Sequence, residues 1–265
     1  TAEAEAEAEA EAEAAVAVTE AEALIAALGS VLGSFQFKND QEIQNDKPDQ
    51  SDPEKNAYFE ALEKLVQGYE NPTYSGLAPI CAEGNCGILV LKKAKDAVDK
   101  DRGKVLETVI DKLRADLATP NSPLPDLFKD AIQRYKGTRQ EKIRECFTNI
   151  NKLNEYLSPE EVQLIGYCYG LKVQVFQKTK EDGRETLFCS YSFPENLDYK
   201  SSPLQQCDIL FHELREAHKE DSSNPNPSHF SLMKPKPSDG ETIPGRSDGA
   251  DGEGGSGGGS GGSGG

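Results

Sequence analysis

Helical patterns fill the first part of this sequence and strand patterns fill the last part, and this order constrains the fold more than any other feature. Apolar residues recur at helical spacing between residues 53 and 169, whereas apolar and polar residues alternate from residue 171 onward. Helices that precede a run of strands favour an α+β fold. We therefore expect helices around a small, mainly antiparallel sheet that follows the chain as a meander.

The helix nearest the strands has the clearest start and stop signals. Ser158 suits the N-cap, and Glu161 stands three positions later, as in a capping box. Pro159 suits the first helical position, and Gly170 ends the helix. Amphipathic stripes predict further helices at residues 53–69, 86–101, 104–117, 126–135 and 139–156.

The strands follow from alternation and turn chemistry. Leu171, Val173 and Val175 alternate with polar residues, and Glu181–Arg184 has the composition of a hairpin turn. The expected strands cover residues 171–177, 186–193, 208–212 and 229–233.

Both ends of the chain have compositions that do not suit a core. Residues 1–52 contain an Ala/Glu dipeptide repeat, an amphipathic segment from Ala15 to Phe35 and a polar linker. The amphipathic segment either docks on the following domain or binds a partner. Residues 234–265 form a flexible tail rich in Pro, Gly and Ser. We therefore expect one folded domain at residues 53–233.

The charge of the chain limits its partners. The formal net charge is −17, which disfavours binding to nucleic acid and to anionic membrane surfaces. A protein partner with a basic face suits this charge. No apolar run reaches the roughly 18 residues that a membrane-spanning helix needs.

The six cysteines are scattered through apolar contexts and do not form the framework of a small disulfide-rich domain. No signal peptide pattern opens the sequence. We therefore expect reduced thiols and a cytoplasmic location, or the host cytoplasm for a pathogen effector. His212 and Glu213 begin like a zincin motif, but Glu216 stands where the second histidine belongs, so no metal or other cofactor is expected.

One cysteine stands in a context that suits a nucleophile. Cys86 follows the turn-forming residues Gly84 and Asn85 and opens an apolar run. At a helix N-terminus, free main-chain N–H groups favour the thiolate and can also hold an oxyanion. A general base is then required, and His229 is our candidate because it begins a late strand after a turn-rich segment.

These motifs resemble the ovarian tumour (OTU) family of cysteine proteases. The resemblance covers residues 70–233: Glu-Gly-Asn-Cys at residues 83–86, the helix and strand at residues 162–176, and His-Phe-Ser-Leu at residues 229–232. It implies a papain-like OTU fold in which Cys86 is the nucleophile and His229 the base. It also implies that the substrate is ubiquitin, polyubiquitin or a ubiquitin-like modifier, which is released from lysine side chains.

The third catalytic residue is left open by the sequence. The family usually has Asp at the position of Glu83 and often has Asp or Asn two residues beyond the base, where this chain has Ser231. We predict Glu83, with Ser231 and Asn226 as alternatives. Two other functions remain open: a catalytically inactive OTU-like module that binds ubiquitin, and an acidic scaffold in which Cys86 is only a core residue.

Overall fold

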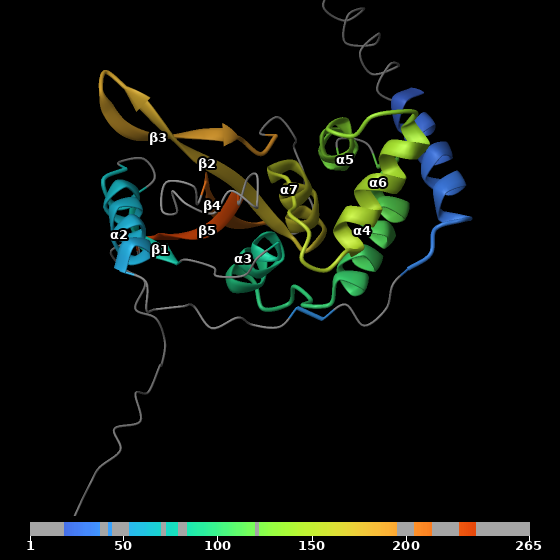
Figure 1. The fold of residues 1–265 in the computed structure, drawn as a ribbon. Helices are drawn as coiled ribbons and strands as arrows, with labels where there is room; N and C mark the ends of the chain where they lie inside the picture. The colour runs from blue at the N-terminus through green and yellow to red at the C-terminus, as the bar shows by residue number, and fades with distance from the viewer. Residues whose placement is uncertain are drawn as a thin grey trace, which may run out of the picture.

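The computed structural model describes residues 19–37, 42–43, 53–69, 73–78, 84–119, 122–194, 204–213 and 228–236. A helical segment at residues 19–32 comes first (Figure 1). The later helices are α2 (Pro53–Gln67), α3 (Cys86–Ala94), α4 (Arg102–Asp116), α5 (Leu124–Gln133), α6 (Arg139–Asn151) and α7 (Pro159–Cys168). The strands are β1 (Tyr74–Ala78), β2 (Leu171–Glu181), β3 (Arg184–Tyr191), β4 (Gln205–Glu213) and β5 (Ser228–Pro235).

The strands form one mixed sheet with the order β1-β5-β4-β2-β3. Three ladders are antiparallel, and the ladder between β2 and β4 is parallel. The prediction of an α+β fold is therefore confirmed, and that of a mainly antiparallel sheet is partly correct. The expected meander is wrong, because the β2–β3 hairpin stands at one edge and β4 pairs with the other side of β2. Strand β1 was not predicted, because its sequence, Tyr-Ser-Gly-Leu-Ala, contains Ser75 and Gly76 and does not alternate between apolar and polar residues.

Local signals explain where these elements begin. The side chain of Ser158 accepts a hydrogen bond from the main-chain N–H of Glu161, whose carboxylate accepts one in return from the main chain of Ser158. Helix α6 has the same reciprocal contact between Thr138 and Glu141. The hairpin between β2 and β3 turns at Asp182 and Gly183, both at positive φ.

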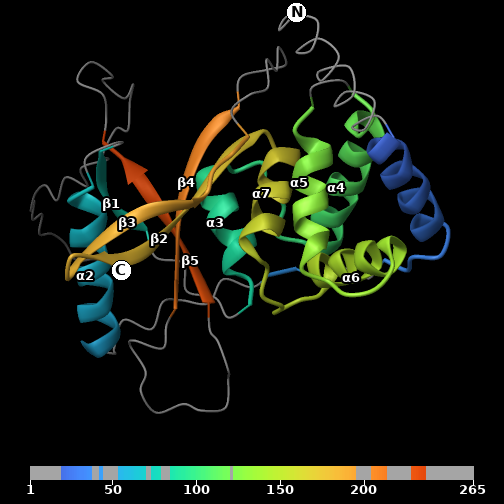
Figure 2. The same cartoon turned by 90° about the horizontal axis from the view of Figure 1, so that it is seen from above.

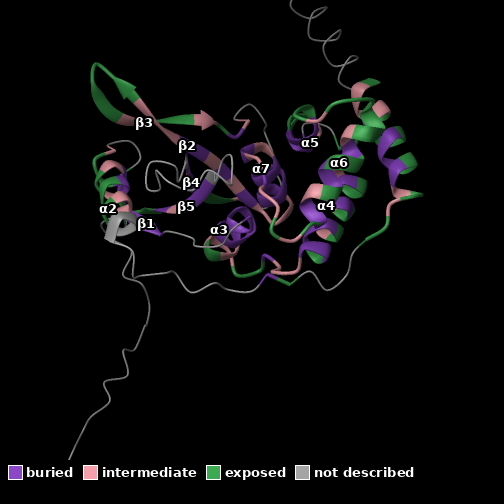
Figure 3. Cartoon of the chain, viewed as in Figure 1, coloured by how far each residue is buried: buried purple, intermediate pink, exposed green. Residues whose placement is uncertain are grey.

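Helices cover both faces of the sheet and create two cores. Helix α2 lies on one face, and α3, α7 and the α4–α6 group lie on the other (Figures 1 and 2). The smaller core joins α2 to the α2-facing side chains of the strands, among them Phe176, Leu210 and Met233. The larger core joins the other face to the remaining helices (Figure 3). The start of β5 therefore lies between two packed layers.

The helical segment at residues 19–32 belongs to the larger core. Leu24, Leu28 and Val31 are buried there, and the segment lies beside α4 and α6 (Figures 1 and 2). Of the two interpretations of this amphipathic segment, docking on the following domain is therefore the one that the structure shows. The Ala/Glu repeat, and the tail beyond residue 236, lie outside the described residues. None of the helices among the described residues is long and apolar enough to cross a membrane.

Candidate thiol active site

Cys86 is the first residue of α3, as its sequence context predicts, and Asn85 is the N-cap. The turn before it requires a glycine. Gly84 has a φ of +67°, and a Cβ at this position would stand 2.1 Å from the main-chain oxygen of Asn154. The loop that carries the cysteine, residues 84–86, is therefore pressed against the connector between α6 and α7.

Asn85 fixes this loop through its side chain. Its Oδ1 accepts hydrogen bonds from the main-chain N–H of Asn154 at 3.1 Å and from Arg102 Nη2 at 3.0 Å. Its Nδ2 donates to Asn154 Oδ1 at 2.5 Å. The amide side chain is thus committed to the turn, so any contribution of Asn85 to an oxyanion site must come from its main chain.

The Cys86 thiol is buried, with 1% of the residue exposed. Burial raises the pKa of this thiol to about 11, although the main-chain N–H groups of Phe230 and Gly87 and the charge of Arg102 act in the opposite direction. The helix N-terminus therefore favours the thiolate as expected, but desolvation outweighs it. The thiol is neutral near pH 7 in this conformation.

His229 lies on β5 directly opposite His212 of β4. The two rings are 5.5 Å apart between centroids. Alternation along β5 places His229 on the same face as Met233, which packs in the smaller core with α2, whereas Phe230 belongs to the larger core with Cys86. The structure thus brings the Cys86 thiol to the main chain of the residue after His229, and it places the imidazole itself beside His212.

The electrostatics of His229 follow from this burial. Its pKa is lowered to about 4 by desolvation, so the ring is neutral near pH 7. Its Nε2 atom is buried and has no hydrogen-bond partner in the part of the chain that the structure describes. A neutral imidazole has one ring nitrogen that can accept a proton, but burial makes His229 a weak base in this conformation.

Ser231 contacts the other histidine. Its Oγ lies 3.1 Å from His212 Nε2, and the Tyr58 hydroxyl lies 3.4 Å from His212 Nδ1. Burial is the main cause that lowers the pKa of His212 to about 3, and repulsion from Lys178 and from His229 in its protonated form acts in the same direction. Glu83 and Asn226, the other two candidates for the third residue, lie outside the described residues.

Sequence reasoning missed two polar residues at this site. His212 was not expected at the site, because its place opposite His229 depends on the register between β4 and β5. Arg102 is fully buried and donates hydrogen bonds to the cysteine loop, although its sequence position resembles the ordinary start of an amphipathic helix. Among the described residues, no group of three or more His, Cys, Asp or Glu side chains could hold a metal ion.

Comparison with known proteins gives a distant structural likeness. No protein-family model matches the chain, and no curated protein matches it. Among solved structures, the chain is similar to an OTU deubiquitinase from Wolbachia pipientis wMel bound to ubiquitin, with 16% identity and a TM-score of 0.32. The match covers 60% of this chain and 94% of that one. A likeness at this distance assigns neither a family nor an activity to the chain.

Proposed function

We propose that the protein is a cysteine-dependent deubiquitinase with a papain-like, OTU-like fold. It hydrolyses the isopeptide bond after the C-terminal glycine of ubiquitin or of a ubiquitin-like modifier. The observation that carries the proposal is the position of Cys86, which opens α3 with its thiol against the main chain of β5, one residue from His229. This juxtaposition agrees with the sequence motifs around both residues.

The proposed reaction has two halves. His229 takes the proton of Cys86, and the thiolate attacks the glycyl carbonyl to give a tetrahedral oxyanion. Main-chain N–H groups near Gly84, Asn85 and Cys86 stabilise that oxyanion. His229 then protonates the lysine amine as the C–N bond breaks, and a thioester remains. Water, deprotonated by His229, cleaves the thioester and returns the thiol.

Substrate binding has a defined task in this scheme. The free protein holds a neutral thiol and a neutral imidazole on two sides of β5. Because alternate residues of a strand point to opposite faces, the main chain at the start of β5 must rearrange to bring the His229 ring from His212 to the thiol before the proton can move. A ubiquitin C-terminus that enters beside the start of β5 supplies the contacts for this change, and Glu83, or else Ser231 or Asn226, then orients the ring.

The chemistry and charge of the chain suit this substrate and setting. A net charge of −17 favours a partner with a basic face. Reduced thiols fit the expected cytoplasmic location, since a disulfide at Cys86 would remove the nucleophile. The cysteines among the described residues are all free thiols.

The test uses ubiquitin that carries a C-terminal electrophile. We expect the protein to gain the mass of one ubiquitin, and we expect Cys86→Ala to abolish this adduct. Cys146→Ala is the matched control, because Cys146 is equally buried but lies in α6, away from β5. An adduct that persists in Cys86→Ala, or that is lost in both variants, contradicts the assignment of the nucleophile.

The buried thiol and the pairing of His229 with His212 favour one alternative, a module that binds ubiquitin without cleaving it. In that case the wild-type protein forms no adduct, yet unmodified ubiquitin still binds with the same affinity to the wild type and to Cys86→Ala. Titration of isotope-labelled ubiquitin, followed by its amide resonances, separates the two functions.

A further inference from the structure

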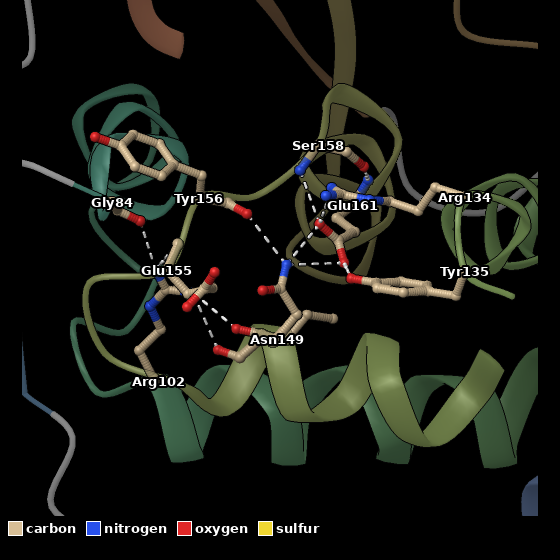
Figure 4. Close-up of polar contacts among 10 residues, drawn as sticks. Gly84, Arg102, Arg134, Tyr135, Asn149, Glu155, Tyr156, Ser158 and Glu161 are labelled. Atoms are coloured by element: carbon tan, nitrogen blue, oxygen red, sulfur yellow. Dashed lines mark hydrogen bonds and ion pairs between the residues drawn. The ribbon is translucent and has the colours of Figure 1, made fainter. Parts of the chain in front are cut away.

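Arg102 joins the cysteine loop to a second part of the chain. The residue lies at the start of α4 and is 0% exposed. Its Nη2 donates to the main-chain oxygen of Gly84 at 2.7 Å and to Asn85 Oδ1 at 3.0 Å. The same nitrogen donates to the main-chain oxygen of Glu155 at 2.6 Å (Figure 4). One guanidinium therefore holds the two residues that precede Cys86.

The other side of this contact is itself firmly held. Arg102 Nη1 donates to the main-chain oxygens of Asn149 and Ile150. The side chain of Asn149 donates to the carboxylate of Glu161 and to the main-chain oxygen of Tyr156 (Figure 4). The connector between α6 and α7 is thus fixed to α7, and Arg102 transmits this fixed position to the cysteine loop.

The charge of Arg102 has no carboxylate partner within ion-pair distance in the described part of the chain. Within the described residues, the guanidinium donates to main-chain oxygens and to the side-chain amide oxygen of Asn85, all of which are neutral. The ionisable groups that face it are Cys86, Glu161 and Glu155. Glu161 is already paired with Arg134, and Glu155 with Lys152. A buried charge without a counter-ion is costly, and a nearby anion offsets that cost.

We propose that Arg102 is a positioning residue for Cys86, which holds the main chain of the cysteine loop and provides the countercharge for the Cys86 thiolate. The proposal rests on the proposed thiol chemistry but does not depend on the identity of the substrate. The direction of the electrostatic effect agrees with it, since the charge of Arg102 lowers the pKa of the thiol. Arg102 is the charged side chain that acts on the thiol within the described residues, and His229 stands next to Phe230 on β5.

The first measurement is the rate at which a small alkylating reagent modifies Cys86 at fixed pH, read by mass spectrometry of its peptide. Removing the charge in Arg102→Gln lowers the thiolate fraction, so we expect alkylation to slow about tenfold. A purely structural role predicts the opposite sign, because a looser loop exposes the thiol. Arg102→Lys keeps the charge, so its alkylation rate should not fall below that of the wild type. The control Arg134→Gln, at the far end of the network, should stay within about threefold of the wild-type rate.

The second measurement is amide hydrogen exchange of the peptide that covers residues 84–91. Lysine cannot span both sides of the contact, so Arg102→Lys should exchange at least about tenfold faster there, whereas Arg134→Lys matches the wild type. This variant decides the positioning role even where Arg102→Gln does not fold. Unchanged exchange in Arg102→Lys, or faster alkylation in a folded Arg102→Gln, overturns the proposal. If both effects occur but ubiquitin gives no adduct, the proposed substrate is wrong and the role of Arg102 stands.

Discussion

At the scale of single residues, the candidate site is determined by close contacts that the sequence only partly reveals. The need for a turn before Cys86 could be predicted from Gly84 and Asn85, because both residue types are typical of unusual backbone angles. The contact of that turn with Asn154 could not, because it joins residues about 70 positions apart. The same holds for Arg102, whose five donors meet oxygens from three separate segments.

Gly84→Ala should destabilise the protein more than a positive φ alone explains. The new Cβ would meet the main chain of Asn154, which cannot move without breaking the Asn85 contacts. Gly183→Ala is the matched control, because Gly183 also has a positive φ but its Cβ would meet nothing within 4 Å. We expect the free energy of unfolding in urea to fall by about 1 kcal/mol in Gly183→Ala and by about 3 kcal/mol or more in Gly84→Ala. Equal losses of unfolding free energy in the two variants would show that the cysteine loop can move to accommodate the new Cβ.

The two facing histidines should make the protein sensitive to acid. Their pKa values in the fold are about 3 for His212 and about 4 for His229, below the value near 6.5 of an unfolded chain. As pH falls from about 6.5 toward 4, the two histidines become protonated in the unfolded chain but stay neutral in the folded protein. The free energy of unfolding therefore decreases in this pH window. Each histidine contributes a slope of about 1.4 kcal/mol per pH unit, and His212→Gln should remove one such slope from urea unfolding measured between pH 7 and pH 4. An unchanged slope contradicts the burial of His212.

At the scale of elements, helix signals were the most informative part of the sequence. The capping box at Ser158 predicted the start of α7 correctly, because both of its hydrogen bonds are local. The topology of the sheet was harder to predict from the sequence. The parallel pairing of β2 with β4 joins residues 171–177 to residues 205–211, and no local pattern specifies that partner.

The joint between α6 and α7 depends on one buried carboxylate. Glu161 is 0% exposed and accepts hydrogen bonds from Asn149, Tyr135 and Arg134. Glu161→Gln replaces one acceptor oxygen by a donor that faces other donors, so we expect the free energy of unfolding to fall by about 3 kcal/mol. Glu160→Gln, at the neighbouring position, should stay within about 0.5 kcal/mol. Equal values for the two variants would contradict the network drawn in Figure 4.

At the scale of the whole molecule, the sheet is a layer between two cores, and the candidate site lies where α3 meets β5. The predicted domain at residues 53–233 contains most of the sheet, but β5 continues to Pro235, and the larger core also includes side chains from residues 19–32. Helical spacing predicted an amphipathic segment there. Its docking site could not be predicted, because an apolar stripe does not specify what covers it.

The contribution of this first helix to the fold can be measured with two of its own residues. Leu28 is 3% exposed and belongs to the larger core, whereas Ile25 is 40% exposed. Truncating a buried leucine removes apolar contacts and leaves a cavity, so Leu28→Ala should lower the free energy of unfolding by about 2–5 kcal/mol. Ile25→Ala should cost less than about 1 kcal/mol, because most of that loss depends on burial. Urea unfolding followed by circular dichroism gives both values. A single transition that shifts in Leu28→Ala shows that the helix unfolds together with the sheet, whereas equal stability of the two variants would make it a separate appendage and leave residues 53–233 as the whole folding unit.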